Sequence, residues 1–372
     1  MAEKQRVEWI DIAKGIGMLL VIVGHTMTTP IRYANTVNYD IYSLIYFFHM
    51  PLMFYLSGRT FGMFINRNIE YTPQIWFKKK WHTLMTPFVV YAVLVYIIFT
   101  VGNMVPGLGN VLTKEGYGKQ SFTHWLFGMV TMQGDDLYCI HLWFIYALFL
   151  MNLCSYFAGK YMKTNHKVFL FVISYTMLCL RILFLDINYW GIINLFMKCY
   201  FWFVLGTYVD ISKLAKSWLS RVWAVLGCTY AWIFINNYGE YREVISSWAR
   251  PVIYGTPVFI SEVLLEILKD FADVGIMLGV INITMCLCGA IKRFFAYTGK
   301  NSYGIYLFHQ PFFASGCGAI LYTVVGLPVT LAILITFALC YIVPIVIMKL
   351  LDTKYLSFLK PFLLGTPRKK RV

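Results

Sequence analysis

The sequence predicts an all-α polytopic membrane protein, a bundle of about ten transmembrane helices with both termini in the cytoplasm. Hydrophobic residues make up 59% of its 372 positions and charged residues only 13%. A soluble domain carries roughly 25% charged residues. Apolar runs of about 20 residues, the length at which a helix crosses a bilayer, recur along the chain. Lys and Arg outnumber Asp and Glu by 32 to 17, which gives a net charge of +15.

The surplus of Lys and Arg predicts the orientation of the helices. Positive residues collect in cytoplasmic loops, where they also face anionic lipid, so this charge requires no nucleic acid as a partner. With the N-terminus inside and ten spans counted, most Lys and Arg residues fall in cytoplasmic segments. We expect one integral-membrane domain over residues 1–372, without a fused soluble domain. Its ten spans are expected near residues 11–29, 43–64, 82–101, 141–159, 167–185, 190–209, 218–236, 271–291, 303–324 and 328–349.

One further apolar segment, residues 251–268, is ambiguous. Its sequence, "PVIYGTPVFISEVLLEIL", holds two prolines together with Glu262 and Glu266. Counting it as a full span would place either "IKRFFAYTGK" or the basic tail "PRKKRV" outside, against the positive-inside rule. We therefore expect it at the outer face or partly embedded, leading into a long tilted helix.

The cysteines predict neither a metal site nor a disulfide framework. The nine cysteines form no CxxC motif and no cluster with histidine at zinc spacing. Most lie in apolar runs, where cysteine acts as a small hydrophobic residue.

Lys14 and His25 are two ionisable residues in the first predicted span. A helix turns 100° and rises 1.5 Å per residue, so eleven residues return to nearly the same face, ~20° away and roughly 16 Å along the axis. Taken alone, Lys14 fits a lysine that extends to the membrane interface, and His25 fits a bond to a neighbouring helix. A neutral histidine is also the usual general base near pH 7.

Four more ionisable residues, His49, Arg59, Lys198 and His309, lie in predicted spans, where such groups are costly and often functional. His49 precedes Pro51, which breaks the helix hydrogen-bond ladder, and the same helix holds Gly58 for close packing. Arg59 requires a carboxylate, phosphate or carbonyl partner. The role of Lys198 stays open. Together the residues predict a bundle lined with histidines and cations, which favours an anionic ligand over a proton relay built on Asp and Glu.

Four segments resemble the acyltransferase family 3 of membrane O-acyltransferases, in the branch of the fucose O-acetylases. They follow the order of the family along nearly the whole chain, and the family also has ten helices. One stretch departs from the pattern: in "FKKKWHTLMTP", Lys80 matches the first arginine of an Arg-x-x-Arg motif, but Thr83 occupies the second position. The segments are "RVEWIDIAKGIGMLLVIVGHT" with the Lys-x10-His pair, "FFHMPLMFYLSG" (47–58), "HLWFIYALF" (141–149) and "GKNSYGIYLFHQP" (299–311).

The resemblance implies transfer of an acetyl group from cytoplasmic acetyl-CoA to a hydroxyl of a cell-surface or secreted glycan, in the inner (plasma) membrane. Acetyl-CoA is the donor substrate, and no permanently bound cofactor is implied. His25 is expected to act as the general base, and His309 or Arg59 to stabilise the oxyanion or orient the donor. The expected donor-binding residues are Lys14, Arg59, Lys78, Lys79 and Lys80. Residues expected to shape the site are Asp11, His49, Pro51, Ser57, Trp143 and Tyr303. Trp125, Asp135 and Asp136 are candidates for acceptor binding.

Other classes of function make different predictions. A transporter or flippase of a glycan or a small anionic molecule would also have ten helices and buried cations, but it would move substrate without consuming acetyl-CoA. The other major type of membrane-bound O-acyltransferase requires an Asn and His pair that we do not find. A lysophosphatidate-type acyltransferase requires His-x4-Asp, and no histidine here has Asp five residues later. A scaffold protein would not need Lys14, His25, Arg59 and His309 in its helices.

Overall fold

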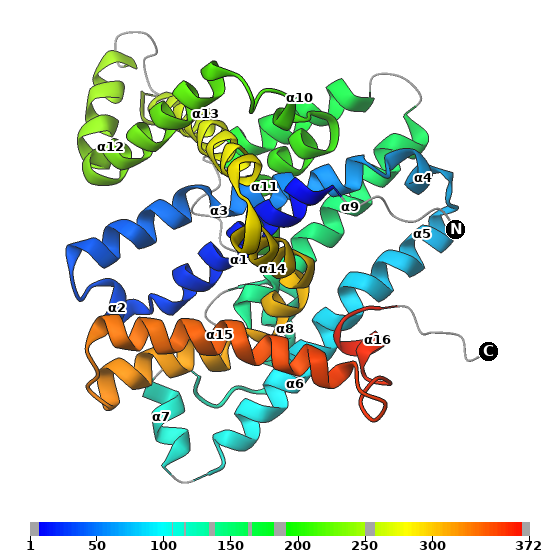
Figure 1. The fold of residues 1–372 in the computed structure, drawn as a ribbon, viewed down its shortest axis with the longest axis vertical. Helices are drawn as coiled ribbons and strands as arrows, with labels where there is room; N and C mark the ends of the chain where they lie inside the picture. Colours follow the sequence, from blue (N-terminus) through cyan, green and yellow to red (C-terminus); the bar gives the residue numbers. More distant parts are fainter. Residues whose placement is uncertain are drawn as a thin grey trace.

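The computed structural model describes residues 7–105, 107–114, 117–133, 138–162, 166–181, 191–249 and 257–366. All regular elements in these ranges are helical, so the chain is an all-α polytopic membrane protein (Figure 1). The α-helices are α1 (Glu8–Thr26), α2 (Thr29–Arg32), α3 (Thr36–Gly62), α4 (Ile65–Glu70), α5 (Pro73–Lys80), α6 (Thr86–Gly102), α7 (Leu108–Lys114), α8 (Phe122–Thr131), α9 (Trp143–Tyr161), α10 (His166–Leu180), α11 (Gly191–Tyr208), α12 (Trp218–Ala249), α13 (Pro257–Cys286), α14 (Gly289–Phe308), α15 (Val329–Leu351) and α16 (Lys360–Leu363). The short π-helical and 3₁₀ turns are η1 (Trp81–Met85), η3 (Ile140–Leu142), η5 (Ile211–Lys213), η6 (Phe312–Cys317) and η7 (Ile320–Val324).

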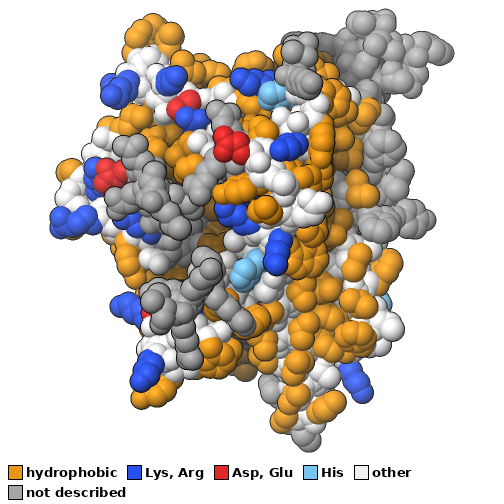
Figure 2. Space-filling view, turned by 90° about the vertical axis from the view of Figure 1, so that its right-hand side faces the viewer, with side chains coloured by type: hydrophobic (Ala, Val, Ile, Leu, Met, Phe, Trp, Pro, Cys, Tyr) orange, Lys and Arg blue, Asp and Glu red, His pale blue; other side chains and the backbone are white. Residues whose placement is uncertain are grey.

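Six helical stretches among the described residues are long and apolar enough to cross a membrane. Their outward faces carry large hydrophobic side chains, such as Ile97 and Ile98 of α6, each 50% exposed. Figure 2 shows hydrophobic side chains spread over one face of the molecule with single Lys and Arg residues between them. A soluble protein rarely exposes so much contiguous apolar surface, so these faces contact lipid. The total of ten spans stays a prediction. The six stretches are Glu8–Thr26, Thr36–Gly62, Pro73–Gly102, Ile140–Tyr161, Trp218–Asn237 and Val329–Leu351.

Helix α1 lies in the middle of the fold and crosses α14 at backbone contact (Figure 1). A Cβ atom on Gly15 would lie 2.1 Å from the carbonyl oxygen of Phe295, and one on Gly299 would lie 1.7 Å from that of Asp11. Only glycine allows two helices to approach this closely, which is how helices pack tightly inside lipid. The crossing therefore fixes α14 against α1.

Helices α3 and α11 form a second close contact. A Cβ atom on Gly58 would lie 2.0 Å from the carbonyl oxygen of Phe203, and one on Gly206 would lie 2.0 Å from that of Tyr55. This contact confirms the close packing predicted at Gly58. Helix α1 also packs against α3. The helices α14, α1, α3 and α11 are therefore joined by consecutive close contacts.

The ambiguous segment 251–268 is only partly described. Residues 257–268 form the start of α13, which continues to Cys286 and packs against α12. At 1.5 Å per residue, its 30 residues span about 45 Å, more than the ~30 Å hydrocarbon core of a bilayer. The helix must therefore tilt or project from the membrane, and how far its first turns are embedded stays a prediction.

The structure differs from the expected span at 303–324. Helix α14 begins earlier, at Gly289, and ends at Phe308, and π-helical turns follow from Phe312. Pro311 explains the interruption, because proline has no N–H to continue the helix ladder. The break turns the chain just after His309, at the centre of the candidate site.

Candidate active site

Three histidines from distant parts of the sequence meet beside the end of α1. The ring centres of His25 and His309 are 5.3 Å apart, and those of His141 and His309 are 5.6 Å apart. His25 belongs to the last turn of α1, His309 follows α14, and His141 lies in the short turn η3 before α9. Sequence reasoning singled out His25 and His309. It missed His141, although that residue opens the "HLWFIYALF" segment.

The hydrogen bonds of His309 define its tautomer. Its Nδ1 lies 2.7 Å from the carbonyl oxygen of Tyr306. A carbonyl only accepts, so Nδ1 carries the proton and Nε2 of the neutral ring presents a lone pair. This buried Nε2 has no hydrogen-bond partner among the described residues. His49 is held in the same way, with Nδ1 2.7 Å from the carbonyl oxygen of Ile45. Both rings are therefore oriented as acceptors.

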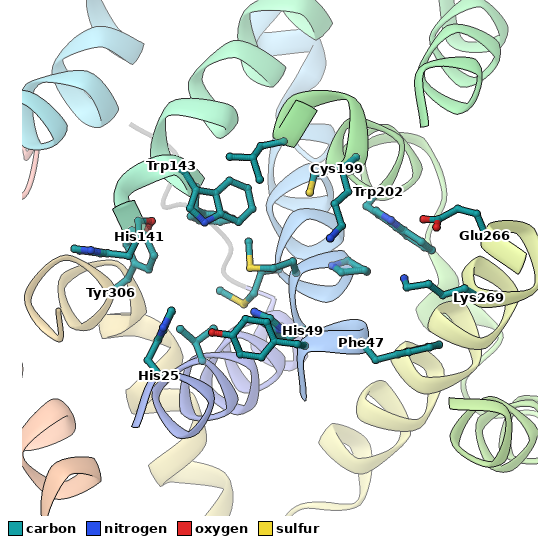
Figure 3. Close-up of a pocket in the computed structure, with 18 residues that line it drawn as sticks. His25, Phe47, His49, His141, Trp143, Cys199, Trp202, Glu266, Lys269 and Tyr306 are labelled. Atoms are coloured by element: carbon teal, nitrogen blue, oxygen red, sulfur yellow. The ribbon is translucent and has the colours of Figure 1, made fainter. Parts of the chain in front are cut away.

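His25 and His141 line a cavity of about 210 Å³, called here the histidine cavity, whereas His309 lies next to both rings but is not part of the lining. In Figure 3, His25, His141 and Tyr306 lie on one side and Glu266 and Lys269 on the opposite side. The Tyr306 hydroxyl donates to the carbonyl oxygen of His141 and thereby ties α14 to η3. The predicted residues His49, Pro51 and Trp143 also line this cavity. The site thus combines a histidine wall with a charged wall.

The charged wall comes mainly from α13, whose role the sequence left open. Lys269 Nζ lies 2.7 Å from Asp273 one turn later, and Arg181 lies 3.5 Å from Glu266. Lys198 of α11 also lines the cavity, and the described residues give it no ion pair. Pairing inside the bundle explains how α13 carries Glu266, Lys269 and Asp273 in an apolar helix.

A second cavity, of about 380 Å³, lies near the start of α1 and is called here the lysine cavity. Lys14, Lys79 and Lys80 line it together with Ser57 and Thr60. Lys14 Nζ donates to Thr60 Oγ1 at 2.9 Å. Three cations around one cavity favour an anionic group such as a phosphate.

The lysine and histidine cavities follow one another along the same helices. Met53 of α3 lines the histidine cavity, and Ser57, one turn later, lines the lysine cavity and donates to the Met53 carbonyl oxygen at 2.8 Å. On α1, Lys14 borders the lysine cavity and His25 the histidine cavity. The sequence spacing of Lys14 and His25 thus corresponds to two cavities at two depths.

A third cavity, of about 710 Å³, lies beyond His25 and is called here the Arg32 cavity. Its lining includes Thr28, Arg32, Tyr33 and Tyr117. His25 and Tyr46 border this cavity and the histidine cavity alike. His25 therefore stands between a central chamber and a polar chamber at the far end of α1.

Several predicted residues lie elsewhere. Arg59 forms an ion pair of 2.6 Å with Asp210 and lines none of the three cavities, and Lys78 is exposed on α5. Their donor-binding roles stay predictions. Trp125 is buried, stacks on Tyr96 with the ring centres 4.6 Å apart, and lines none of the three cavities.

The remaining candidates belong to the frame of the site. The Tyr303 hydroxyl donates to the carbonyl oxygen of Thr83 at 3.1 Å, and Asp11 provides the backbone contact to Gly299. Asp135 and Asp136 lie outside the described residues. Among the described residues, no group of three or more His, Cys, Asp or Glu side chains is arranged to hold a metal ion.

Comparison with known proteins assigns the family. A family model described as an acyltransferase domain, that of acyltransferase family 3, matches residues 7–349, from the start of α1 to the last turns of α15. No curated protein and no solved structure matches the chain. The matched range contains all three cavities, and the fucose O-acetylase-like branch stays a prediction. The chain therefore belongs to acyltransferase family 3, a family of membrane acyltransferases.

Proposed function

We propose that this membrane acyltransferase transfers an acetyl group from acetyl-CoA to a hydroxyl of a cell-surface or secreted glycan, in the inner (plasma) membrane. The observation that carries the proposal is the series of three cavities along α1, with His25 bordering two of them. The series suits a reaction whose two substrates approach one base from opposite ends.

The lysine cavity is the proposed donor site. Coenzyme A carries phosphates, and ammonium groups such as those of Lys14, Lys79 and Lys80 bind phosphate by charge-assisted hydrogen bonds. Lys14 is already oriented by its hydrogen bond to Thr60. From there the thioester arm extends past Ser57 and Met53 into the histidine cavity.

The histidine cavity is the proposed place of reaction. The hydroxyl oxygen of the acceptor attacks the thioester carbonyl carbon, a C–O bond forms and the C–S bond breaks. His25 takes the proton of the hydroxyl and returns it to the leaving thiolate, which departs as free CoA. This is direct transfer; a covalent acetyl intermediate is the alternative route.

His309 is proposed to orient His25. Its Nδ1–H is already donated to the Tyr306 carbonyl oxygen, so the neutral ring has no N–H left to stabilise an oxyanion. Its Nε2 lone pair suits acceptance of an N–H from the neighbouring imidazole of His25, 5.3 Å away between ring centres. Such a contact selects the tautomer of the base, as carboxylates do in other histidine sites.

Kinetics of purified protein in nanodiscs test the assignment of the two cavities. Lys14→Gln is expected to raise the KM for acetyl-CoA about tenfold, the value of one charge-assisted hydrogen bond, and to leave kcat near wild type. His25→Gln is expected to lower kcat by about 10²–10⁴ without raising this KM. Lys300→Gln, an exposed lysine of α14, is the matched control.

Two results would contradict the proposal. A Lys14→Gln variant with an unchanged KM would remove the lysine cavity as the donor site. Movement of a glycan across the membrane without consumption of acetyl-CoA would support the transporter that the sequence also allows.

A further inference from the structure

The Arg32 cavity is where an acceptor would reach His25 if the donor arrives through the lysine cavity. It borders His25 on the side away from Lys14 and measures about 710 Å³. Cavities of about 300–1,000 Å³ are typical of small-molecule sites. The inference below rests on the proposed function, because it names the acceptor class for that site.

An aromatic stack holds Arg32 at the wall of this cavity. The guanidinium carbon lies 3.5 Å from the ring centre of Tyr42, and Tyr42 stacks on Tyr46 at 4.0 Å. Tyr46 in turn meets the His25 ring edge-on at 6.4 Å. Stacking on tyrosine fixes the plane of a guanidinium and leaves its N–H edge for a ligand. The stack thus connects Arg32 to the base.

The charge of Arg32 is not balanced by the described part of the chain. No described carboxylate lies within ion-pair distance of it, and no described Asp or Glu lines the cavity. Among the described residues its buried Nε has no hydrogen-bond partner, which is equally true of Arg59 and Arg181, so the missing carboxylate is what sets Arg32 apart. Arg59, by contrast, is paired with Asp210, and Arg181 with Glu266. A planar donor without a partner favours a planar or tetrahedral anion, which it binds through two parallel N–H bonds.

We propose that Arg32 binds an anionic group, a carboxylate or a phosphate, carried by the acceptor glycan, so that the enzyme selects acidic over neutral glycans. The anion on Arg32 sets the position of the sugar ring, and a hydroxyl of that ring then reaches His25. Arg32 is a specificity residue in this account, and His25 remains the base.

Binding of matched sugars to the full chain in phosphatidylcholine nanodiscs tests the proposal. The probes are methyl glucoside, methyl glucuronide and methyl glucoside 6-phosphate, and the measured quantity is Kd by titration calorimetry. Wild type is expected to bind one of the anionic probes at least about tenfold more tightly than the neutral one. The anionic probe with the lower Kd, the glucuronide or the 6-phosphate, identifies the anion as a carboxylate or a phosphate.

Two Arg32 variants and one control isolate the contact. Arg32→Gln is expected to remove the preference and leave the neutral probe unchanged, and Arg32→Lys to keep only part of the preference, because lysine lacks the planar fork. Arg221→Gln, an exposed arginine of α12, is the control and is expected to keep the full preference. Unchanged binding of the neutral probe shows that a variant is folded.

Three outcomes would overturn the inference. They are equal affinity of wild type for neutral and anionic probes, no binding of either anionic probe, and a preference that survives in Arg32→Gln. Weaker binding of the anionic probe after half the lipid is replaced by phosphatidylglycerol would assign Arg32 to a lipid phosphate instead. Loss of thioester cleavage is measured separately, so a protein that binds anionic sugars but never cleaves acetyl-CoA would contradict only the proposed function.

Discussion

The glycine contact between α1 and α14 gives a prediction that links packing to catalysis. In Gly299→Ala the new Cβ atom would lie 1.7 Å from the Asp11 carbonyl oxygen and 2.9 Å from the Gly15 nitrogen. Real Cβ atoms essentially never approach other atoms within 3.0 Å. Both neighbours are backbone atoms that cannot rotate away, so the two helices must move apart.

The substitution is expected to lower both stability and activity. Overpacking of this kind costs about 1–3 kcal/mol of folding free energy. Helix α1 carries His25 and α14 leads directly into His309, so the displacement changes the distance between their rings, now 5.3 Å. A misplacement of about 1 Å costs catalysis on the order of 100-fold. We expect kcat/KM for acetyl-CoA to fall by about that factor while the protein remains folded.

The assay is the release of free CoA by purified protein in nanodiscs, together with thermal unfolding. Gly318→Ala is the matched control, since its Cβ atom would lie 3.5 Å from the nearest atoms, an ordinary contact beside Thr26. It is expected to retain wild-type rates. A Gly299→Ala enzyme with wild-type kcat/KM would show that the α1–α14 contact does not set the geometry of the histidines.

Two ion pairs give the remaining predictions. Asp210→Asn and Arg59→Gln are each expected to lower stability by about 1 kcal/mol, because both side chains of the pair are 21% exposed. Each variant is also expected to keep the KM for acetyl-CoA within about twofold of wild type. Thermal unfolding measures the first effect and donor kinetics the second. A large rise in KM in Arg59→Gln alone would restore its donor-binding role. Lys269→Met leaves the fully buried Asp273 carboxylate without its ion-pair partner and is expected to lower the free energy of unfolding by about 3–5 kcal/mol. The double variant with Asp273→Asn is expected to recover most of this free energy. Equal thermal stability of the single and double variants would contradict this pairing.

The fold class and part of the site could be predicted because their signals are local. Apolar runs of membrane length and the bias of positive charge are read along the chain, and the separation of eleven positions from Lys14 to His25 puts both residues on one helix face. His309 was already visible as an ionisable residue in an apolar run, and the family resemblance added its expected role. These predictions required no knowledge of which helices touch.

The rest of the site depends on contacts between distant residues. Asp210 pairs with Arg59 across 151 positions, so the sequence offered no reason to choose this partner over a phosphate. His141 becomes informative only when η3 brings it next to His309. In the sequence, Glu266 made a buried helix at this place look unfavourable, and only the structure shows that Arg181 is its ion-pair partner. Nonlocal pairing of this kind has no periodic signature in the sequence.

The most direct test of the account is the release of free CoA from acetyl-CoA by wild type and by His25→Gln, both purified in nanodiscs and shown to be folded by thermal unfolding. The account predicts measurable thioester cleavage by wild type and a loss of about 10²–10⁴ in the variant, with acetyl-CoA still bound. Equal cleavage by the two proteins would contradict the role of His25 as the base between the three cavities.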